Sequence, residues 1–251
     1  MSIFTADELE GMKDCAWVLK EIVRDLEKGI KPGAKTGDID KHTADLVEQY
    51  GVRAAFRGYR GYPACTTTSV NEEVIDGVPG SRMLKEGDLL KLQLGIENDG
   101  FHSYWAGTYA VGAIPENART LMEVTRRAVA EAVRKATAGA LVEEISRAIQ
   151  TTIEGARFEV VRQYCGHGIG RRMHEEPQIP CYVDQRLAGR YRLSAREVVA
   201  IQVLTLEKPA RLASVGGGLT VAAPKGILSA HAGAIVAVGA TPEVLIGSAT
   251  P

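Results

Sequence analysis

The sequence lacks both a charge imbalance and a long apolar run, and these absences limit its partners. Lysine and arginine number 30 and aspartate and glutamate 31, so the formal net charge is -1. Proteins that bind nucleic acid or anionic membranes usually carry an excess of basic residues, and we therefore expect neither partner. The longest apolar runs, such as residues 198–206, are too short to cross a bilayer and are interrupted by Gln202.

Cysteine is scarce and scattered. The 251 residues include four cysteines, Cys15, Cys65, Cys165 and Cys181, and no CxxC spacing. This pattern argues against a zinc knuckle and against a disulfide framework. The first residues also lack the basic and apolar segments of a secretory signal. We therefore expect a reduced, cytoplasmic protein that is a monomer or a dimer.

Helical and strand patterns follow one another along the whole chain. Thr5 and Glu8 form a capping-box pattern before a helix that ends near Gly29, and a second helix ends at Gly51. Further helices are predicted over residues 116–136 and 141–153, and strands over residues 66–70, 89–96, 101–111, 198–205 and 234–238. No linker or low-complexity segment interrupts this pattern, so we expect one α+β domain over residues 1–251.

Two segments of the chain resemble each other. Residues 84–93 and 193–202 both begin with leucine, continue as an apolar strand and end in glutamine at the same spacing. Their expected partner strands both end in Val-Gly, at residues 111–112 and 238–239. The chain is therefore expected to contain two related halves, with the closing glutamines at equivalent positions.

A glycine-rich segment with two histidines lies in the second half. Cys-Gly-His-Gly-Ile-Gly occupies residues 165–170, and His-Glu-Glu-Pro follows at residues 174–177. Glycine allows the backbone to approach a ligand closely, so His167 and His174 are candidates for a functional pair. The alternative, which this segment alone leaves open, is a tight turn with surface histidines.

Several further motifs, taken together with this segment, resemble those of the type I methionine aminopeptidases. The matching segments are residues 61–63, 68–72, 77–79, 84–100, 166–177 and 242–245. The resemblance extends from about residue 5 to residue 246 and implies a single methionine-aminopeptidase-like domain. The implied fold is the α+β pita-bread (creatinase/aminopeptidase) fold, with two pseudo-symmetric halves and a curved antiparallel sheet covered by helices.

The resemblance also implies a site for two divalent metals, and the sequence departs from it there. The family holds its metals with two aspartates, one histidine and two glutamates, and the matching positions are Gln93, Tyr104, His167, Gln202 and Gly233. Dications are stabilised mainly by anionic ligands, whereas four of these five residues are neutral and are not usual ligands. We therefore expect no metal, no cofactor and no aminopeptidase activity.

The remaining polar residues predict an acid–base site. By resemblance, His174 matches the histidine that contacts the substrate's carbonyl group, and Asp76 stands where the family has a second substrate-facing histidine. The candidate catalytic residues are His174, Asp76, Tyr104 and His167, and the candidate substrate-binding residues are Gln93, Gln202, Trp105 and Tyr62.

Plainer interpretations of several residues remain open. Asp76 is equally consistent with a turn residue, and Trp105 is more simply explained by core packing. The two glutamines could bond each other across the family's metal cavity. His42, His102 and His231 are expected to be structural or surface residues.

Two functions from different classes fit these features. The favoured expectation is a metal-independent lyase, isomerase or cyclase that catalyses isomerisation, cyclisation, elimination or hydration of a small-molecule substrate. The alternative is a non-catalytic pseudo-peptidase binding module. A residual peptidase with an unexpected cofactor is a third, less favoured interpretation.

Overall fold

Helices and antiparallel sheets make up the computed structural model, which describes residues 3–248; the ends of the predicted domain, residues 1–2 and 249–251, lie outside the described residues. The helices are α1 (Ala6–Glu27), α2 (Thr36–Gln49), α3 (Glu116–Lys135) and α4 (Val142–Gly155), with short 3-10 helices η1 (Tyr59–Gly61) and η2 (Gly216–Gly218). The strands are β1 (Arg53–Ala54), β2 (Thr66–Val70), β3 (Glu73–Ile75), β4 (Leu89–Asn98), β5 (Phe101–Ala110), β6 (Glu159–Val160), β7 (Cys165–Gly168), β8 (Glu175–Pro180), β9 (Val198–Leu206), β10 (Ala213–Val215), β11 (Thr220–Ala222), β12 (Ser229–Ala237) and β13 (Glu243–Gly247). No helix within residues 3–248 is long and apolar enough to cross a membrane.

Local sequence signals set the ends of several elements. Thr5 caps α1: its side chain accepts a hydrogen bond from the backbone N–H of Glu8, whose carboxylate accepts one from Thr5. The hairpin between β4 and β5 turns through Asp99 and Gly100, both at positive φ, which is the backbone that right-handed strand twist favours in a two-residue turn. The predicted capping box and hairpin are therefore confirmed. The last predicted strand begins earlier than expected, at Ser229, because the small residues before residue 234 carry little strand signal.

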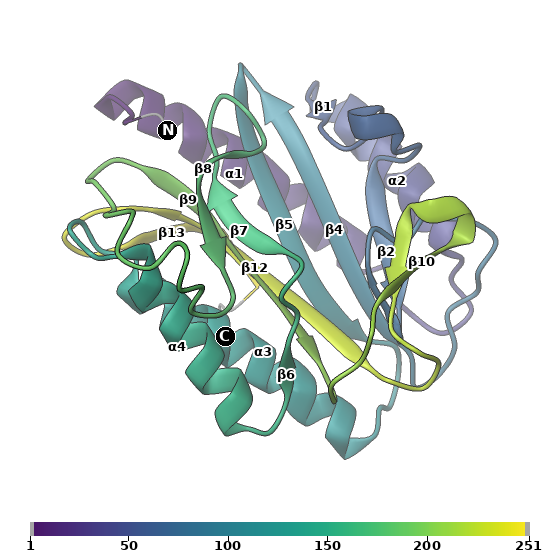
Figure 1. Ribbon diagram of the computed structural model, residues 1–251. Coiled ribbons are helices and arrows are strands. Elements are labelled where there is room, and N and C mark those ends of the chain that lie inside the picture. Colours follow the sequence, from purple (N-terminus) through teal and green to yellow (C-terminus); the bar gives the residue numbers. More distant parts are fainter. Residues whose placement is uncertain (1–2, 249–251) are drawn as a thin grey trace.

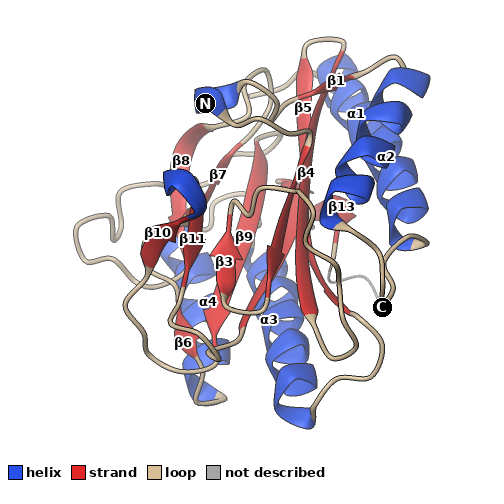
Figure 2. Ribbon diagram, turned by 90° about the vertical axis from the view of Figure 1, so that its right-hand side faces the viewer, coloured by secondary structure: helices blue, strands red, loops and turns tan. Residues whose placement is uncertain are grey.

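The sheets are organised around two central strands, β4 and β9. β4 pairs with β1, β2 and β5, and β9 pairs with β6, β7 and β12, all antiparallel. Leu92 and the other leucines on one face of β4 pack in the core with α1 and α2. Ile201 and its neighbours on one face of β9 pack in the core with α3 and α4. Figures 1 and 2 show the two helix pairs beside their respective strands.

Equivalent backbone hydrogen bonds relate the two halves. The N–H of Leu84 donates to the carbonyl oxygen of Ala34 at 2.8 Å, and that of Leu193 donates to Ala140 at 2.9 Å. Both leucines are buried just before a central strand. The predicted fold, an α+β arrangement of two related halves, is confirmed by this pairing and by the antiparallel sheets.

The other faces of the central strands meet in the interior. Thr108 of β5 joins the two sheets: its hydroxyl donates to the carbonyl oxygen of His231 on β12 and accepts from the His231 N–H, both at 2.8 Å. Because side chains alternate along a strand, polar residues at alternate positions of β4, β5, β9 and β12 face this interior. The candidate site is built there.

Candidate active site

Five buried polar side chains from five strands form one group, which we call the inner cluster. Its members are Gln93 of β4, Tyr104 of β5, His167 of β7, Gln202 of β9 and His231 of β12. Four of them were predicted as site residues. The strand pairing brings them together, since Gln202 lies opposite Gly233 and next to β7 in the sheet.

His231 lies at the centre of one half of the cluster. Its Nδ1 accepts from the side-chain amide of Gln93 at 2.9 Å, so its Nε2–H donates to the hydroxyl oxygen of Tyr104 at 3.4 Å. Burial, and then the nearby charge of Lys91, lowers the pKa of His231 to about 3. The imidazole is therefore neutral at physiological pH. The sequence marked this histidine only as structural or surface, because nothing local distinguishes it within a run of small residues.

His167 anchors the other half of the cluster. Its Nδ1–H donates to the carbonyl oxygen of Gly168, and its Nε2 accepts from the amide of Gln202, both at 2.9 Å. Burial, followed by the neighbouring His174, lowers the pKa of His167 to about 4. The two glutamines thus each bond a histidine, and the idea that they bond each other is wrong.

His174 is exposed and lies above His167. The ring centroids of His174 and His167 are 4.4 Å apart, and those of His174 and Tyr59 are 5.4 Å apart. The Tyr59 hydroxyl and the Nδ1 of His174 are 3.0 Å apart. Desolvation of the ring, followed by the charge of Arg60, lowers the pKa of His174. Sequence reasoning missed Tyr59; its only signal was an aromatic, glycine-rich loop.

Asp76 follows β3 at a positive φ of 58° and is half-buried. The next residue must be glycine, because a Cβ on Gly77 would lie 2.4 Å from the carbonyl oxygen of Thr68. Burial raises the pKa of Asp76 to about 6. Within the described residues no hydrogen bond joins Asp76 to His174, so their predicted partnership has no direct contact to support it.

The remaining two predicted residues lie outside the inner cluster. Trp105 is next to Tyr104 on β5 and therefore faces the opposite way, into the core with α1. Tyr62 is buried, and its hydroxyl is within hydrogen-bonding distance of the carbonyl oxygens of Thr66 and Gly77, at 3.2 Å and 2.8 Å. Their roles in substrate binding stay predictions.

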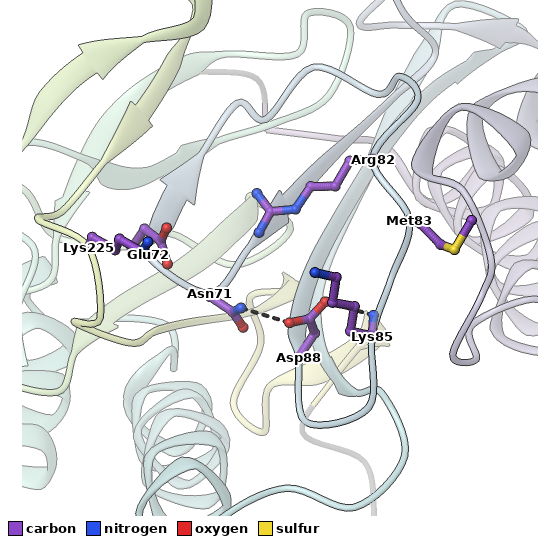
Figure 3. A pocket seen from close by; sticks show the side chains of 7 residues that line it. All are labelled: Asn71, Glu72, Arg82, Met83, Lys85, Asp88 and Lys225. Atoms are coloured by element: carbon purple, nitrogen blue, oxygen red, sulfur yellow. Dashed lines mark hydrogen bonds between the residues drawn. The ribbon is translucent and has the colours of Figure 1, made fainter.

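A surface cavity of about 450 Å³ lies apart from these residues. It is lined by Asn71, Glu72, Arg82, Met83, Lys85, Asp88 and Lys225 (Figure 3). The Asn71 amide donates to the Asp88 carboxylate at 2.8 Å across its floor. Positive and negative side chains are mixed in its lining, and none of the predicted site residues belongs to it.

The class of protein follows from the match of this chain to a known family. Residues 10–227 match the family described as Metallopeptidase family M24, and the chain belongs to this family.

Two similar proteins and one similar crystal structure are methionine aminopeptidases. The chain is 39% identical over 178 residues to methionine aminopeptidase 1 of Bacillus subtilis, covering 71% of this chain and 72% of that protein. It is 35% identical over 225 residues to the methionine aminopeptidase of Clostridium perfringens, covering 90% of each. The crystal structure of methionine aminopeptidase from Thermotoga maritima superposes with a TM-score of 0.93 at 32% identity over 98% of both chains.

These relatives overturn the functional expectation. A metal-independent lyase, isomerase or cyclase and the alternative of a non-catalytic binding module are both wrong, because proteins named methionine aminopeptidase match across 71% and 90% of this chain. The expectation of absent aminopeptidase activity is corrected for the same reason. That expectation depended on four positions of the chain, whereas the similarity to these relatives extends over the whole fold.

The family name implies a bound metal. The side chains at the positions implied by resemblance are not suitable metal ligands. The interior positions implied by resemblance offer two amides, a phenol, one imidazole and a glycine. Within residues 3–248 no group of three or more His, Cys, Asp or Glu side chains is placed to hold a metal ion. His167 and His231 already use both ring nitrogens in hydrogen bonds. No chemical step is therefore assigned to a metal.

Proposed function

We propose that this chain is an aminopeptidase that acts on the first residue of a peptide beside His174. Support comes from the relatives and from one observation in particular: an exposed imidazole, His174, is in ring contact with both Tyr59 and the buried His167. Such a ring is accessible to a substrate and is held in place by its contacts with Tyr59 and His167. Its position above a fixed, buried cluster suits the binding of a peptide's first carbonyl group.

His174 would donate a hydrogen bond to that carbonyl oxygen. When the Tyr59 hydroxyl donates to Nδ1, the proton of the neutral ring is on Nε2, which is then free to donate. The lowered pKa keeps the ring neutral near pH 7. A fixed donor aimed at a carbonyl stabilises the negative charge that develops there when water attacks.

The inner cluster would act as a support. Gln202 and Gly168 fix both nitrogens of His167, and the fixed ring of His167 lies against His174. A side chain whose neighbour is locked by hydrogen bonds loses less freedom when substrate binds. Tyr59 and His167 are therefore positioning residues for His174.

We also infer that the protein is cytoplasmic. Cys15, Cys65, Cys165 and Cys181 are free thiols, and three of them are buried. Thiols that remain unpaired are the usual state in a reducing compartment.

Kinetics on a short peptide such as Met-Ala-Ser test the role of His174. We expect His174→Ala to lower kcat about 10²–10³-fold and Tyr59→Phe to lower it less, because phenylalanine keeps the ring contact and loses the hydrogen bond. His42→Ala, which changes an exposed histidine elsewhere, is the matched control. Equal rates for His174→Ala and the wild type, in preparations free of host aminopeptidase, would overturn the proposal.

A further inference from the structure

The carboxylate of Asp76 has no partner. The backbone carbonyl oxygen of Asp76 accepts a hydrogen bond from the Thr220 hydroxyl at 3.3 Å, and within residues 3–248 its carboxylate makes no hydrogen bond or ion pair. Some other aspartates of the chain have partners. The Oδ1 of Asp40, for example, accepts from the backbone N–H groups of Cys65 and Thr66 at 2.8 Å and 2.9 Å.

The position of this carboxylate is held by the surrounding backbone. Asp76 keeps a positive φ, which disfavours residues other than glycine and costs about 1 kcal/mol or more. Gly77 lies against β2, its N–H donates to the Ser69 hydroxyl at 2.9 Å, and its carbonyl oxygen accepts from Tyr62 at 2.8 Å. These contacts present the side chain at a fixed place in spite of the strained backbone.

Burial, and no charged neighbour, accounts for the raised pKa of the Asp76 carboxylate. Its charge is close enough to Tyr62, Tyr104 and Tyr164 to raise the pKa of each phenol, after the larger effect of burial. Gly77, the next residue, accepts through its carbonyl oxygen from the N–H of Thr68 on β2 at 2.8 Å, and the neighbouring Thr67 is paired with Gln93 of the inner cluster. Asp76 therefore lies beside the strands that carry the candidate site. A half-buried carboxylate without a cation is costly, and a bound cation with N–H donors would remove that cost.

We propose that Asp76 binds the α-ammonium group of the peptide substrate. This inference rests on the proposed function and names the group that would select a free amino terminus. An ammonium has three N–H donors, and the carboxylate accepts one or two of them. A single carboxylate suits a monovalent ammonium, whereas a dication requires several anionic ligands.

Two matched probes test this inference without turnover: methioninol, which carries the ammonium and no peptide bond, and N-acetylmethioninol, in which the charge is removed. Calorimetric titration of the wild type should show about 10–100-fold tighter binding of methioninol, the range of a charge-assisted hydrogen bond. Asp76→Asn, which keeps the shape and tolerates a positive φ, should reduce this preference to near one. Asp45→Asn, at an exposed aspartate, should leave it unchanged.

The outcomes separate the two proposals. A preference that survives in Asp76→Asn would overturn the role of Asp76 and leave the proposed function standing. If the folded wild type binds neither probe, then both proposals are wrong. Asp76→Gly, which removes the charge and suits the positive φ, serves as the second variant if Asp76→Asn does not fold, and it should lose the preference in the same way.

Discussion

At the scale of single residues, the inner cluster is stabilised by hydrogen bonds between uncharged side chains and not by ion pairs. His231 and His167 both have strongly lowered pKa values, and each ring accepts from a glutamine amide. Burying a charged imidazole would be costly, whereas a neutral one with both nitrogens bonded is stable. The cluster therefore depends on every member keeping its partner.

His231→Ala should test this dependence. It removes the partner of the Gln93 amide and of the Tyr104 hydroxyl, both buried, and we expect a loss of about 2–4 kcal/mol in the free energy of unfolding. His42→Ala, at an exposed position, should cost about 0.5 kcal/mol or less. Urea unfolding at pH 7.5 measures both. A His231→Ala variant as stable as His42→Ala would show that the cluster contributes nothing.

Asp76 should make stability fall as pH rises. Its pKa in the folded state is about 6, above the ordinary 3.8, so the folded protein binds this proton more tightly and is destabilised as pH rises from about 4 to 6. Asp76→Asn should therefore stabilise the protein at pH 8 by about 1–2 kcal/mol, because partial exposure screens part of the effect, and change it little at pH 4. Thermal melts at the two pH values, with Asp45→Asn as control, decide this. Equal melting temperatures at pH 8 would contradict the raised pKa.

At the scale of elements, β7 carries His167 because glycine lets it approach β9. A Cβ on Gly166 would lie 2.4 Å from the carbonyl oxygen of Ala200 and 3.1 Å from the N–H nitrogen of Gln202. Both of these atoms are backbone and have little room to move. The glycine-rich segment seen in the sequence therefore serves strand packing as well as the site.

Gly166→Ala should separate β7 from β9 and destabilise the protein by about 2–3 kcal/mol. Gly155→Ala, at the end of α4 where nothing lies within 4 Å of the new Cβ, should be neutral or stabilise by up to about 1 kcal/mol. Both are measured by urea unfolding. Equal stabilities would mean that the two strands have room to separate at no cost.

Local chemistry made much of the fold predictable, and long-range contacts explain what was missed. The capping box at Thr5 and the turn at Asp99 depend on residues within a few positions of one another. Tyr59 and His174 are 115 positions apart, and Gln93 and His231 are 138 apart. No local pattern marks such pairs, so the sequence suggested His174 and Gln93 as candidates and gave no indication of their partners.

At the scale of the whole molecule, the class follows from the entire chain. The family match spans residues 10–227, and both halves keep the same backbone bonds around Leu84 and Leu193. The interior positions that do not fit a metal are few compared with the length of this match. We therefore propose that the chain removes the first residue from peptides, with His174 as the hydrogen-bond donor to the scissile carbonyl.

This activity is measured as the release of methionine from Met-Ala-Ser, detected by mass spectrometry. The wild type and His174→Ala are prepared identically and assayed with chelator and, separately, with added Mn²⁺, Co²⁺ or Fe²⁺, beside the N-acetylated peptide. We expect the wild type to release methionine from the free peptide in at least one condition, His174→Ala to release far less in that condition, and the acetylated peptide to stay intact. No release by the wild type in any condition, or equal release by His174→Ala, would contradict the account.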